Sequence, residues 1–270
     1  MALAPNGPLT IVKLGGSVIT RKREVERLRP KVLARLAREI AEAADAPRIV
    51  LHGAGSFGHP GAARFGLARA PEGTVPPRQR LRGAAIVSAE VRRLHLAVLR
   101  SMVHAGDVPW SVPAANVARN REGQLASFDE GAFSSALATG ATPVSFGDVV
   151  PDDGWGYSIL SADTIALELA RRLRAVRVIF VSDVDGVLTT GSDGRRHVLE
   201  GLTEASVTTL RATTSAPDVT GGIRKKAETM LRIAEQGADA GLISGLRDGA
   251  LSRALRGEAV HGSWCRPAAR

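Results

Sequence analysis

The chain has 270 residues, a single cysteine and a formal net charge of +9 at pH 7. One cysteine, Cys265, excludes an internal disulfide and a multi-cysteine metal site. No apolar run approaches the roughly 20 residues that span a bilayer, so we expect no membrane segment. The arginines are spread along helical stretches and only 4% of the residues are aromatic, so we expect no nucleic-acid partner. The N-terminus lacks a basic region followed by an apolar core, which favours a cytoplasmic protein.

The first elements alternate between short apolar strands and an amphipathic helix. Residues 9–14 and 48–51 are apolar runs that predict buried strands. Between them, apolar residues recur at helical spacing from about Arg29 to Ala44, with arginine and glutamate on the other side. The order of strand, helix and strand predicts a parallel pairing of the two strands.

Each of these two strands ends in a glycine-rich loop. The first is Lys13-Leu14-Gly15-Gly16-Ser17, and the second is His52-Gly53-Ala54-Gly55-Ser56-Phe57-Gly58-His59. Glycines allow a tight turn and leave backbone N–H groups open to an anion. One such loop is often an ordinary connection between a strand and a helix. Two of them, one with a lysine and one with a histidine, predict two phosphates that face each other, as in a small-molecule phosphotransferase.

The rest of the chain continues the alternation of strands and helices. Residues 71–82 contain three prolines and predict a mobile connection, and the small residues Gly83, Ala84 and Ala85 would leave space for an acceptor at the start of the next helix. We predict the following further elements: helices at about 81–105, 130–139 after the capping residue Asp129, 164–174, 204–211, 224–236 and around 251–255; strands at 108–112, 142–146, 176–181 and 240–244; and hairpins at 117–128 and through 152–154.

This order predicts an α/β fold, with a mostly parallel central sheet and helices on both faces. The composition does not change along the chain, which favours one domain. The functional site is expected in the loops at the carboxyl ends of the strands.

Two lysines and one aspartate are candidates for phosphoryl transfer, which needs positive charge around the transferring group. Lys13 belongs to the first glycine loop. Gly222 ends a third glycine-rich turn, and Lys226 lies four residues later, one turn into the helix that follows. Asp163 lies at a helix start and can pair with both ammonium groups. Each residue alone is more often a solvated or capping side chain, so it is the combination with glycine loops that points to function.

Five segments resemble, in this order, the motifs of the amino acid kinase superfamily, and most closely those of its isopentenyl phosphate kinase branch. They are residues 13–17, residues 52–59, Gly147-Asp148, Ser182-Asp183-Val184-Asp185-Gly186-Val187 and Asp218-Val219-Thr220-Gly221-Gly222. The resemblance implies the three-layer amino acid kinase fold, with an acceptor-binding lobe at about 1–146 and an ATP-binding lobe at about 147–270. It also implies ATP-dependent phosphorylation of isopentenyl phosphate to isopentenyl diphosphate, with magnesium carried on the ATP phosphates, no protein metal ligand, and a homodimer.

The same resemblance assigns roles to individual residues. Lys13, Lys22, His59, Asp163 and Lys226 match catalytic positions, with Asp163 organising the lysines. The positions that match ATP contacts are Lys13, Gly15, Gly16, Ser17, Ser182, Asp183, Gly222 and Lys226. The positions that match contacts to the acceptor's phosphate are Ala54, Gly55, His59 and Gly147.

A physical argument independently supports a phosphate monoester as the acceptor. Its second pKa is about 6, so its attacking oxygen is already ionised near neutral pH and needs no general base. The task left for the protein is to hold two anions together, and His59 can donate a hydrogen bond to a phosphate oxygen. The remaining histidines show no metal-binding spacing, and we interpret them as structural: His52, His95, His104, His197 and His261.

Several alternatives remain open at this point. Other alkyl phosphates such as dimethylallyl phosphate are plausible additional acceptors, and a phosphonate kinase of the fosfomycin-phosphorylating type shares the histidine loop. A kinase of a carboxylate such as acetylglutamate would leave His59 without a task. A nucleotide-binding module without turnover is disfavoured by the retention of Lys13, Lys22 and Lys226 together.

Overall fold

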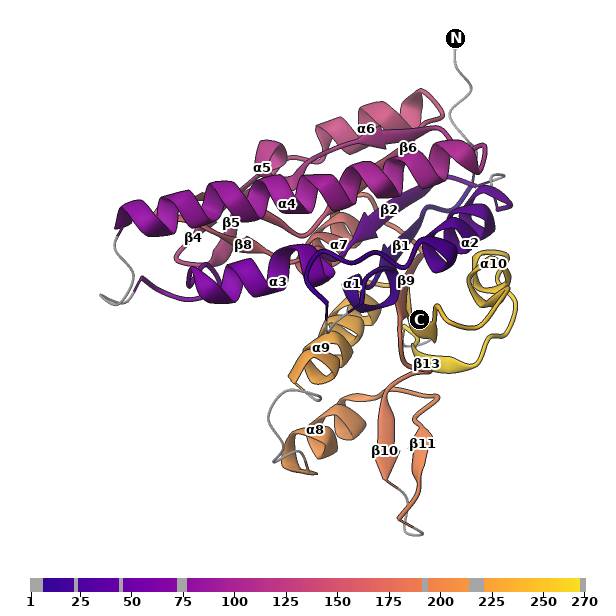
Figure 1. Ribbon diagram of the computed structural model, residues 1–270. Helices are drawn as coiled ribbons and strands as arrows, with labels where there is room; N and C mark the ends of the chain where they lie inside the picture. The colour runs from indigo at the N-terminus through magenta and orange to yellow at the C-terminus, as the bar shows by residue number, and fades with distance from the viewer. Residues whose placement is uncertain are drawn as a thin grey trace.

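The computed structural model describes residues 7–21, 24–43, 46–71, 77–190, 194–213 and 221–267. Its centre is a seven-stranded sheet, ordered β13-β12-β9-β1-β2-β6-β3 (Figure 1). All neighbouring strands of this sheet are parallel except the β12–β13 pair. The strands are β1 (Thr10–Leu14), β2 (Arg48–His52), β3 (Pro109–Ser111), β6 (Thr142–Phe146), β9 (Arg177–Ser182), β12 (Asp239–Ser244) and β13 (Gly262–Cys265).

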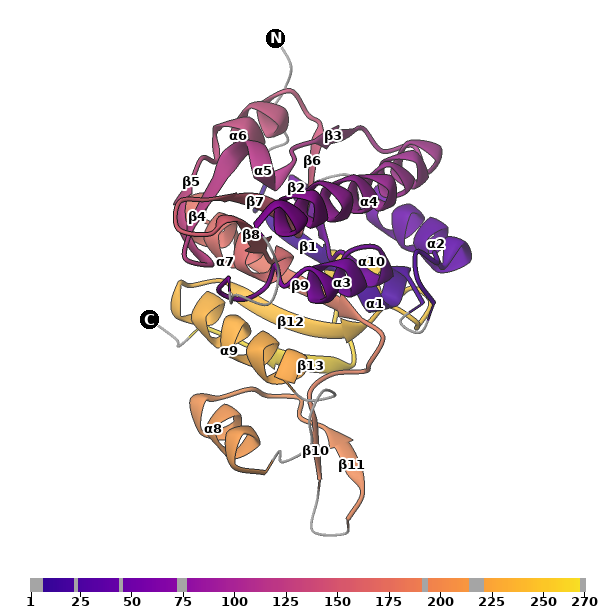
Figure 2. The same cartoon turned by 60° about the vertical axis from the view of Figure 1, so that its left-hand side comes forward.

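Helices cover both faces of this sheet and make the predicted three layers (Figure 2). One face carries α2 (Pro30–Ala41), α4 (Pro77–His104) and α10 (Ala250–Leu255), and the other carries α6 (Gly131–Ala138), α7 (Ala162–Arg172) and α9 (Gly221–Glu235). Side chains alternate between the faces along each strand. In β1, Val12 and Leu14 pack against α2 and α4, whereas Ile11 packs against α7 and α9. This alternation decides which face each site residue reaches.

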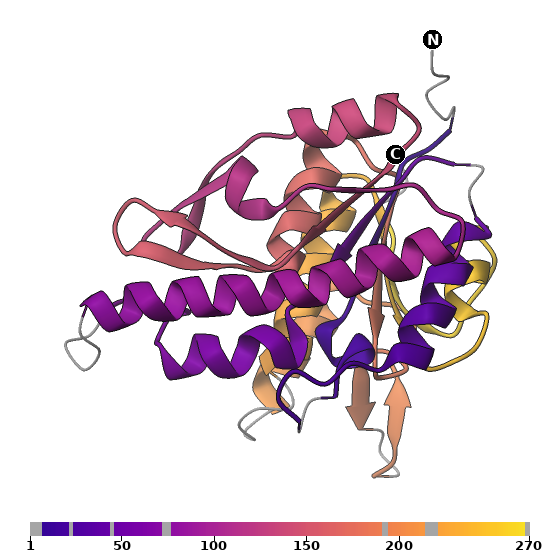
Figure 3. The same cartoon turned by 45° about the horizontal axis from the view of Figure 1, so that its top comes forward.

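The remaining elements surround the carboxyl edge of the sheet or project from it. Two short helices follow the first two strands, and the long α4 lies beside the second of them (Figure 3). A four-stranded sheet ordered β5-β4-β7-β8 lies beside the main sheet, and β10, β11 and α8 project from the body in Figure 1. These elements are α1 (Gly16–Ile19), α3 (Gly55–Arg64), α5 (Ala114–Val117), β4 (Ala118–Arg121), β5 (Gln124–Phe128), β7 (Asp148–Asp152), β8 (Gly156–Leu160), β10 (Leu188–Thr190), β11 (Arg196–Val198) and α8 (Glu204–Thr213).

The predicted strands, hairpins and helices are largely confirmed, with two differences around α4. This helix begins at Pro77, inside the stretch predicted as a mobile connection, because proline is well tolerated in the first turn of a helix; residues 72–76 lie outside the described part of the chain. The expected space at Gly83 is filled, since a Cβ there would collide with the ring of Phe65. The small residue serves the packing of α4 on the end of α3.

Three strands were not predicted. β10 and β11 form a short antiparallel hairpin, and β13 adds an antiparallel strand at the edge of the main sheet. In β13, the indole of Trp264 lies over Gly241, where any side chain would collide with it. Within the described residues, no helix combines the length and the apolar composition of a membrane span.

Candidate active site

The two glycine loops touch each other through their backbones. The Gly15 N–H donates to the Val181 carbonyl over 2.7 Å, and the Gly53 N–H donates to the Leu14 carbonyl over 2.9 Å. A Cβ on Gly53 would lie 2.8 Å from the Gly16 nitrogen, and a Cβ on Gly16 would collide with the backbone of Gly55. The close approach of the two loops therefore requires glycine at these positions, independently of any ligand.

The first loop is tied to the end of β9. The Ser17 hydroxyl donates to Asp183 Oδ1 over 2.6 Å, and the Ser182 hydroxyl lies 3.4 Å from the same oxygen. Strands β1 and β9 are neighbours, but the chain continues from β1 to α2 on one face of the sheet and from β9 on to α9 on the other. Such a switch point is where open α/β sheets bind ligands. The structure thus brings together the predicted ATP contacts Ser17, Ser182 and Asp183.

Lys13, Asp163 and Lys226 form a compact charged triad. Lys13 Nζ lies 2.8 Å from Asp163 Oδ1, and Lys226 Nζ lies 2.7 Å from Asp163 Oδ2. Lys13 alternates with Val12, so it points to the α7 and α9 face, where α7 carries Asp163 and α9 carries Lys226. Oδ1 has no partner in hydrogen-bond geometry, which makes its contact with Lys13 an ionic one.

The triad is largely buried and carries a net positive charge. The side chains of Lys13 and Lys226 are 9% and 11% exposed, and that of Asp163 is 26% exposed. Burial favours the neutral form of Asp163, but the charges of Lys13 and Lys226 outweigh it and hold the pKa of this carboxyl well below its usual range. Burial, followed by the charge of Lys13, lowers the pKa of Lys226 to about 8, although Asp163 acts in the opposite direction. One carboxylate thus holds two ammonium groups together, a suitable arrangement for a polyanion.

The ring of Phe180 supports the ammonium group of Lys226. Lys226 Nζ lies 4.9 Å from the centroid of this ring, which belongs to β9 and is fully buried. Phe180 is the register partner of Lys13 across the β1–β9 pair. A cation over an aromatic face is stabilised by the ring quadrupole. The strand pairing therefore fixes both lysines over adjacent positions of the sheet.

The second loop leads directly into α3, with Ala54 before its first residue and His59 one turn along. Gly55 has φ +51°, a conformation that favours glycine, and Thr20 Oγ1 accepts the N–H of Ser56 over 3.0 Å. The loss of solvent around the His59 ring, and then the charge of Lys13, lower the pKa of this imidazole, and Asp163 acts in the opposite direction. The charges of Lys13 and Asp163 are therefore both felt at this ring. His59 as a whole residue is nevertheless exposed.

Gly147 lies between β6 and β7, next to the second loop. Its N–H donates to the carbonyl of His52 over 3.0 Å, and a Cβ would lie 3.2 Å from the Ala162 nitrogen. Because this N–H is already used, Gly147 can approach an acceptor through its bare Cα but has no amide left to donate. If Gly147 contacts the acceptor as predicted, it does so by leaving room for it and not by a backbone hydrogen bond.

Sequence reasoning did not link His52 with His95. We interpreted both as structural, yet His52 Nε2 lies 3.1 Å from His95 Nδ1, in a buried contact behind the second loop. The available signal was periodicity: His52 alternates with Leu51 in β2, and His95 follows Leu94 on the buried stripe of α4. This signal becomes informative only when the partner helix is known.

The two other predicted site residues are Gly222 and Lys22. Gly222 lies in the first turn of α9, one turn before Lys226, and Lys22 lies outside the described residues.

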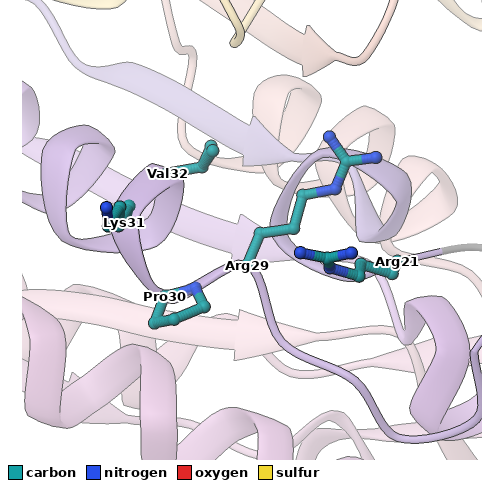
Figure 4. A pocket seen from close by; sticks show the side chains of 5 residues that line it. All are labelled: Arg21, Arg29, Pro30, Lys31 and Val32. Carbon is teal, nitrogen blue, oxygen red and sulfur yellow. The ribbon is translucent and has the colours of Figure 1, made fainter.

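An open hollow of about 550 Å³ on the α1–α2 connection includes none of the predicted site residues (Figure 4). Its lining is Arg21, Arg29, Pro30, Lys31 and Val32. In the described part of the chain, no group of three or more His, Cys, Asp or Glu side chains is arranged to hold a metal ion.

Comparison with known proteins agrees with this geometry. The model of the amino acid kinase family matches residues 8–243. The chain belongs to this family. The isopentenyl phosphate kinase of Methanothermobacter thermautotrophicus is 34% identical over 94% of this chain and 98% of its own length, and that of Thermoplasma acidophilum is 34% identical over 83% and 86%. A solved isopentenyl phosphate kinase structure superimposes with a TM-score of 0.84 at 31% identity, covering 95% of this chain and 99% of the other. The central sheet and the order of its loops are therefore those of the amino acid kinase family.

Proposed function

We propose that the protein catalyses the ATP-dependent phosphorylation of isopentenyl phosphate to isopentenyl diphosphate, a step of isoprenoid biosynthesis. The observation that carries this proposal is the Lys13–Asp163–Lys226 triad beside His59, at the contact of two glycine loops. The high coverage of relatives named isopentenyl phosphate kinase supports the same acceptor. No observation favours a phosphonate, a carboxylate or a purely binding role.

In this proposal the triad acts on the transferring phosphoryl group. A phosphate oxygen of the acceptor attacks the γ-phosphorus of ATP, and the bond to the bridging oxygen of ADP breaks in line with it. The ammonium groups of Lys13 and Lys226 compensate the charge that develops on the transferring oxygens and on ADP. Asp163 holds both in place, so little reorganisation is needed during the reaction. Lys22, the remaining predicted catalytic residue, is proposed to act with them.

The acceptor's phosphate is proposed to bind at the start of α3. Ala54, Gly55 and Gly147 would surround it without side chains in the way, and His59 would donate a hydrogen bond to it. An apolar cluster between α3, α4 and β7 packs against Ala54, and the hydrocarbon tail of the acceptor is proposed to lie against it. Its members are Ala62, Phe65, Leu67, Ala84, Val87, Val91, Phe146 and Val149, with Ala54 and Ile159 packed against them.

The nucleotide is proposed to bind across β1, β9 and α9. Gly15, Gly16 and Ser17 would lie under its phosphates, with Ser182, Asp183 and Gly222 around them. Residues 1–146 would then form mainly an acceptor lobe and residues 147–270 an ATP lobe. Mg²⁺ is proposed to arrive as part of the MgATP substrate, held by the phosphate oxygens.

A homodimer is proposed through the exposed face of α4 and the sheet edge at β3. Val103, Val108 and Trp110 are 60%, 63% and 61% exposed there, and Leu96 is 48% exposed. Because α4 and β3 are in contact, these side chains lie on neighbouring elements, and exposed large apolar side chains that gather on one surface are typical of protein interfaces. Light scattering should give the mass of two chains for the wild type and of one chain for Trp110→Arg; a monomeric wild type would refute the homodimer.

An assay of ADP release with isopentenyl phosphate, fosfomycin and acetylglutamate as separate acceptors tests the proposed function. We expect turnover with isopentenyl phosphate, confirmed by detection of isopentenyl diphosphate as the product. Turnover with acetylglutamate alone would refute a phosphate acceptor. Turnover with fosfomycin alone would keep the phosphoryl-transfer machinery and replace the acceptor.

A further inference from the structure

A chain of hydrogen bonds runs from the edge strand β3 to the second glycine loop, on the sheet face opposite the charged triad. Ser111 Oγ lies 2.8 Å from His95 Nε2, His95 Nδ1 lies 3.1 Å from His52 Nε2, and His52 Nδ1 lies 3.2 Å from the carbonyl oxygen of Gly53. His52 is fully buried and His95 is 5% exposed. A polar network this deep in an apolar layer must be satisfied throughout.

The direction of every hydrogen bond in this chain follows from the acceptor at its end, the Gly53 carbonyl. The Gly53 carbonyl can only accept, so His52 carries its proton on Nδ1 and, when neutral, accepts at Nε2. His95 must then donate from Nδ1 and accept at Nε2, and Ser111 donates to it. Burial, and then the repulsion that a protonated His95 would exert, lower the pKa of His52 to about 3. Burial, and then the charge of Arg92, lower the pKa of His95 to about 4, so both rings are neutral near pH 7.

Aromatic packing fixes the planes of the two imidazoles. The His52 and His95 rings stack with centroids 5.3 Å apart, and the Phe146 ring lies 5.3 Å from the first and 4.3 Å from the second. Arg92 lies over the same phenyl ring and pairs with the buried carboxylate of Asp148, which follows Gly147. The rings therefore cannot turn without disturbing the β6–β7 connection.

We propose that His52 and His95 are positioning residues that orient the acceptor loop through the Gly53 carbonyl. His52 holds this loop in two ways, because its ring donates to Gly53 and its own carbonyl accepts from Gly147. Ala54 and Gly55 follow immediately, so the peptide plane of Gly53 sets the direction in which they face the acceptor. This role rests on the proposed function, since the acceptor's phosphate is assigned there to Ala54, Gly55 and His59.

The kinetic test compares two substitutions of His95. Asn has a side-chain N–H near the position of Nδ1, whereas Leu leaves His52 Nε2 without a donor. We expect His95→Leu to raise the KM for isopentenyl phosphate about tenfold and to leave the KM for ATP within about twofold, with His95→Asn near wild type. His104→Leu, at the exposed end of the same helix, is the matched control. Equal changes of both KM values, or no change in either, would refute a positioning role.

A second measurement does not depend on the substrate and covers the case in which His95→Leu fails to fold. Nitrogen NMR of wild-type protein labelled in histidine should show both buried rings neutral and protonated on Nδ1 at pH 7. Either ring charged, or protonated on Nε2, would overturn the proposed direction of the chain. If the tautomers agree but wild type does not phosphorylate isopentenyl phosphate, the proposed function fails while the hydrogen-bond chain stands.

Discussion

The two faces of the central sheet support the site with opposite chemistry. On the α7 and α9 face, Lys13 belongs to a charged triad with Asp163 and Lys226. On the α4 face, His52, the neighbour of Leu51 in β2, belongs to a neutral chain with His95. Leu51 is itself the register partner of Lys13, so the two systems begin one residue apart on paired strands.

This difference follows from what each side has to do. The group that moves in phosphoryl transfer gains charge on its oxygens, so fixed ammonium groups stabilise it. In the proposed function, the acceptor's phosphate keeps its charge and has to be held in line, which the side-chain-free start of α3 and the His59 imidazole would do. A buried charge behind the acceptor loop would need its own partner, whereas a neutral pair satisfies itself. The predictions below test this division, beginning with the largest expected effect.

Removal of one triad lysine tests the charged face. Lys13→Met should lower kcat by about 10²- to 10³-fold, because it removes one of the ammonium groups proposed to stabilise the transferring phosphoryl. The fold should persist, since Asp163 keeps its contact with Lys226. Steady-state kinetics and a thermal unfolding curve measure the two effects. Lys31→Met, on the exposed start of α2, is the control, and a kcat within threefold of wild type would contradict the role of Lys13.

Substitution of His59 tests the acceptor side. His59→Ala should lower kcat/KM for isopentenyl phosphate by about 10- to 100-fold, the loss expected for a hydrogen bond to a charged group. The KM for ATP should stay nearly unchanged, and His59→Gln, which keeps an N–H donor, should recover part of the loss. A collapse of nucleotide binding in His59→Ala would reassign this loop to ATP.

The pH profile separates the charged face from the neutral one. The pKa of Lys226 is lowered to about 8, so its ammonium group is charged below that pH and loses its proton above it. The value of kcat/KM for ATP, which reports the free enzyme, should therefore fall above about pH 8, by up to tenfold per unit. Lys226→Arg should move this fall to higher pH, because a guanidinium stays charged. The same fall in both proteins would assign it to another group.

Acid sensitivity of the fold tests the neutral pair and gives the smallest effect. The folded-state pKa values of His52 and His95, about 3 and 4, lie below the ordinary 6.5. The unfolded chain thus binds more protons between about pH 4 and 6.5, and the free energy of unfolding falls as the pH falls. Each histidine should contribute about 2 kcal/mol of this loss between pH 7 and 5. Denaturant unfolding should show a loss smaller by about this amount in His95→Asn; an equal loss in both proteins would contradict the buried neutral state.

The sequence predicted what lies in contiguous patterns. The apolar runs predicted the parallel strands, and the glycine loops around Gly16 and Gly55 predicted the edge of the sheet at which the candidate site lies. The meeting of Lys13 with Asp163 and Lys226 was expected from chemistry and resemblance, and alternation along β1 explains why these three residues converge. The roles of the predicted site residues in the reaction remain predictions.

Features that depend on packing between distant segments could not be predicted in the same way. The His52–His95 contact requires knowledge of which helix covers β2, and the small residue Gly83 suggested free space that Phe65 occupies. Strand β13 is four residues long and pairs only at the sheet edge, where Trp264 needs the bare surface of Gly241. In each case the structure of a segment depends on the distant segment that packs against it, and the segment's own sequence does not show which one that is.

The backbone contact of Gly16 with Gly53 and Gly55 fixes the spacing of the two loops independently of the residues that would choose the acceptor's tail. Main chain meets main chain there, with no room for a Cβ, so the distance between the two loops is fixed by the backbone. In the proposed function, this distance sets the span between the donor and recipient phosphates. Substitutions in the apolar cluster that contains Phe65 and Val87 should then change which acceptor tail binds, without changing the distance over which the phosphoryl group is transferred. Substitutions intended to admit a bulkier alkyl phosphate should therefore be made in this cluster and should leave Gly16, Gly53 and Gly55 unchanged.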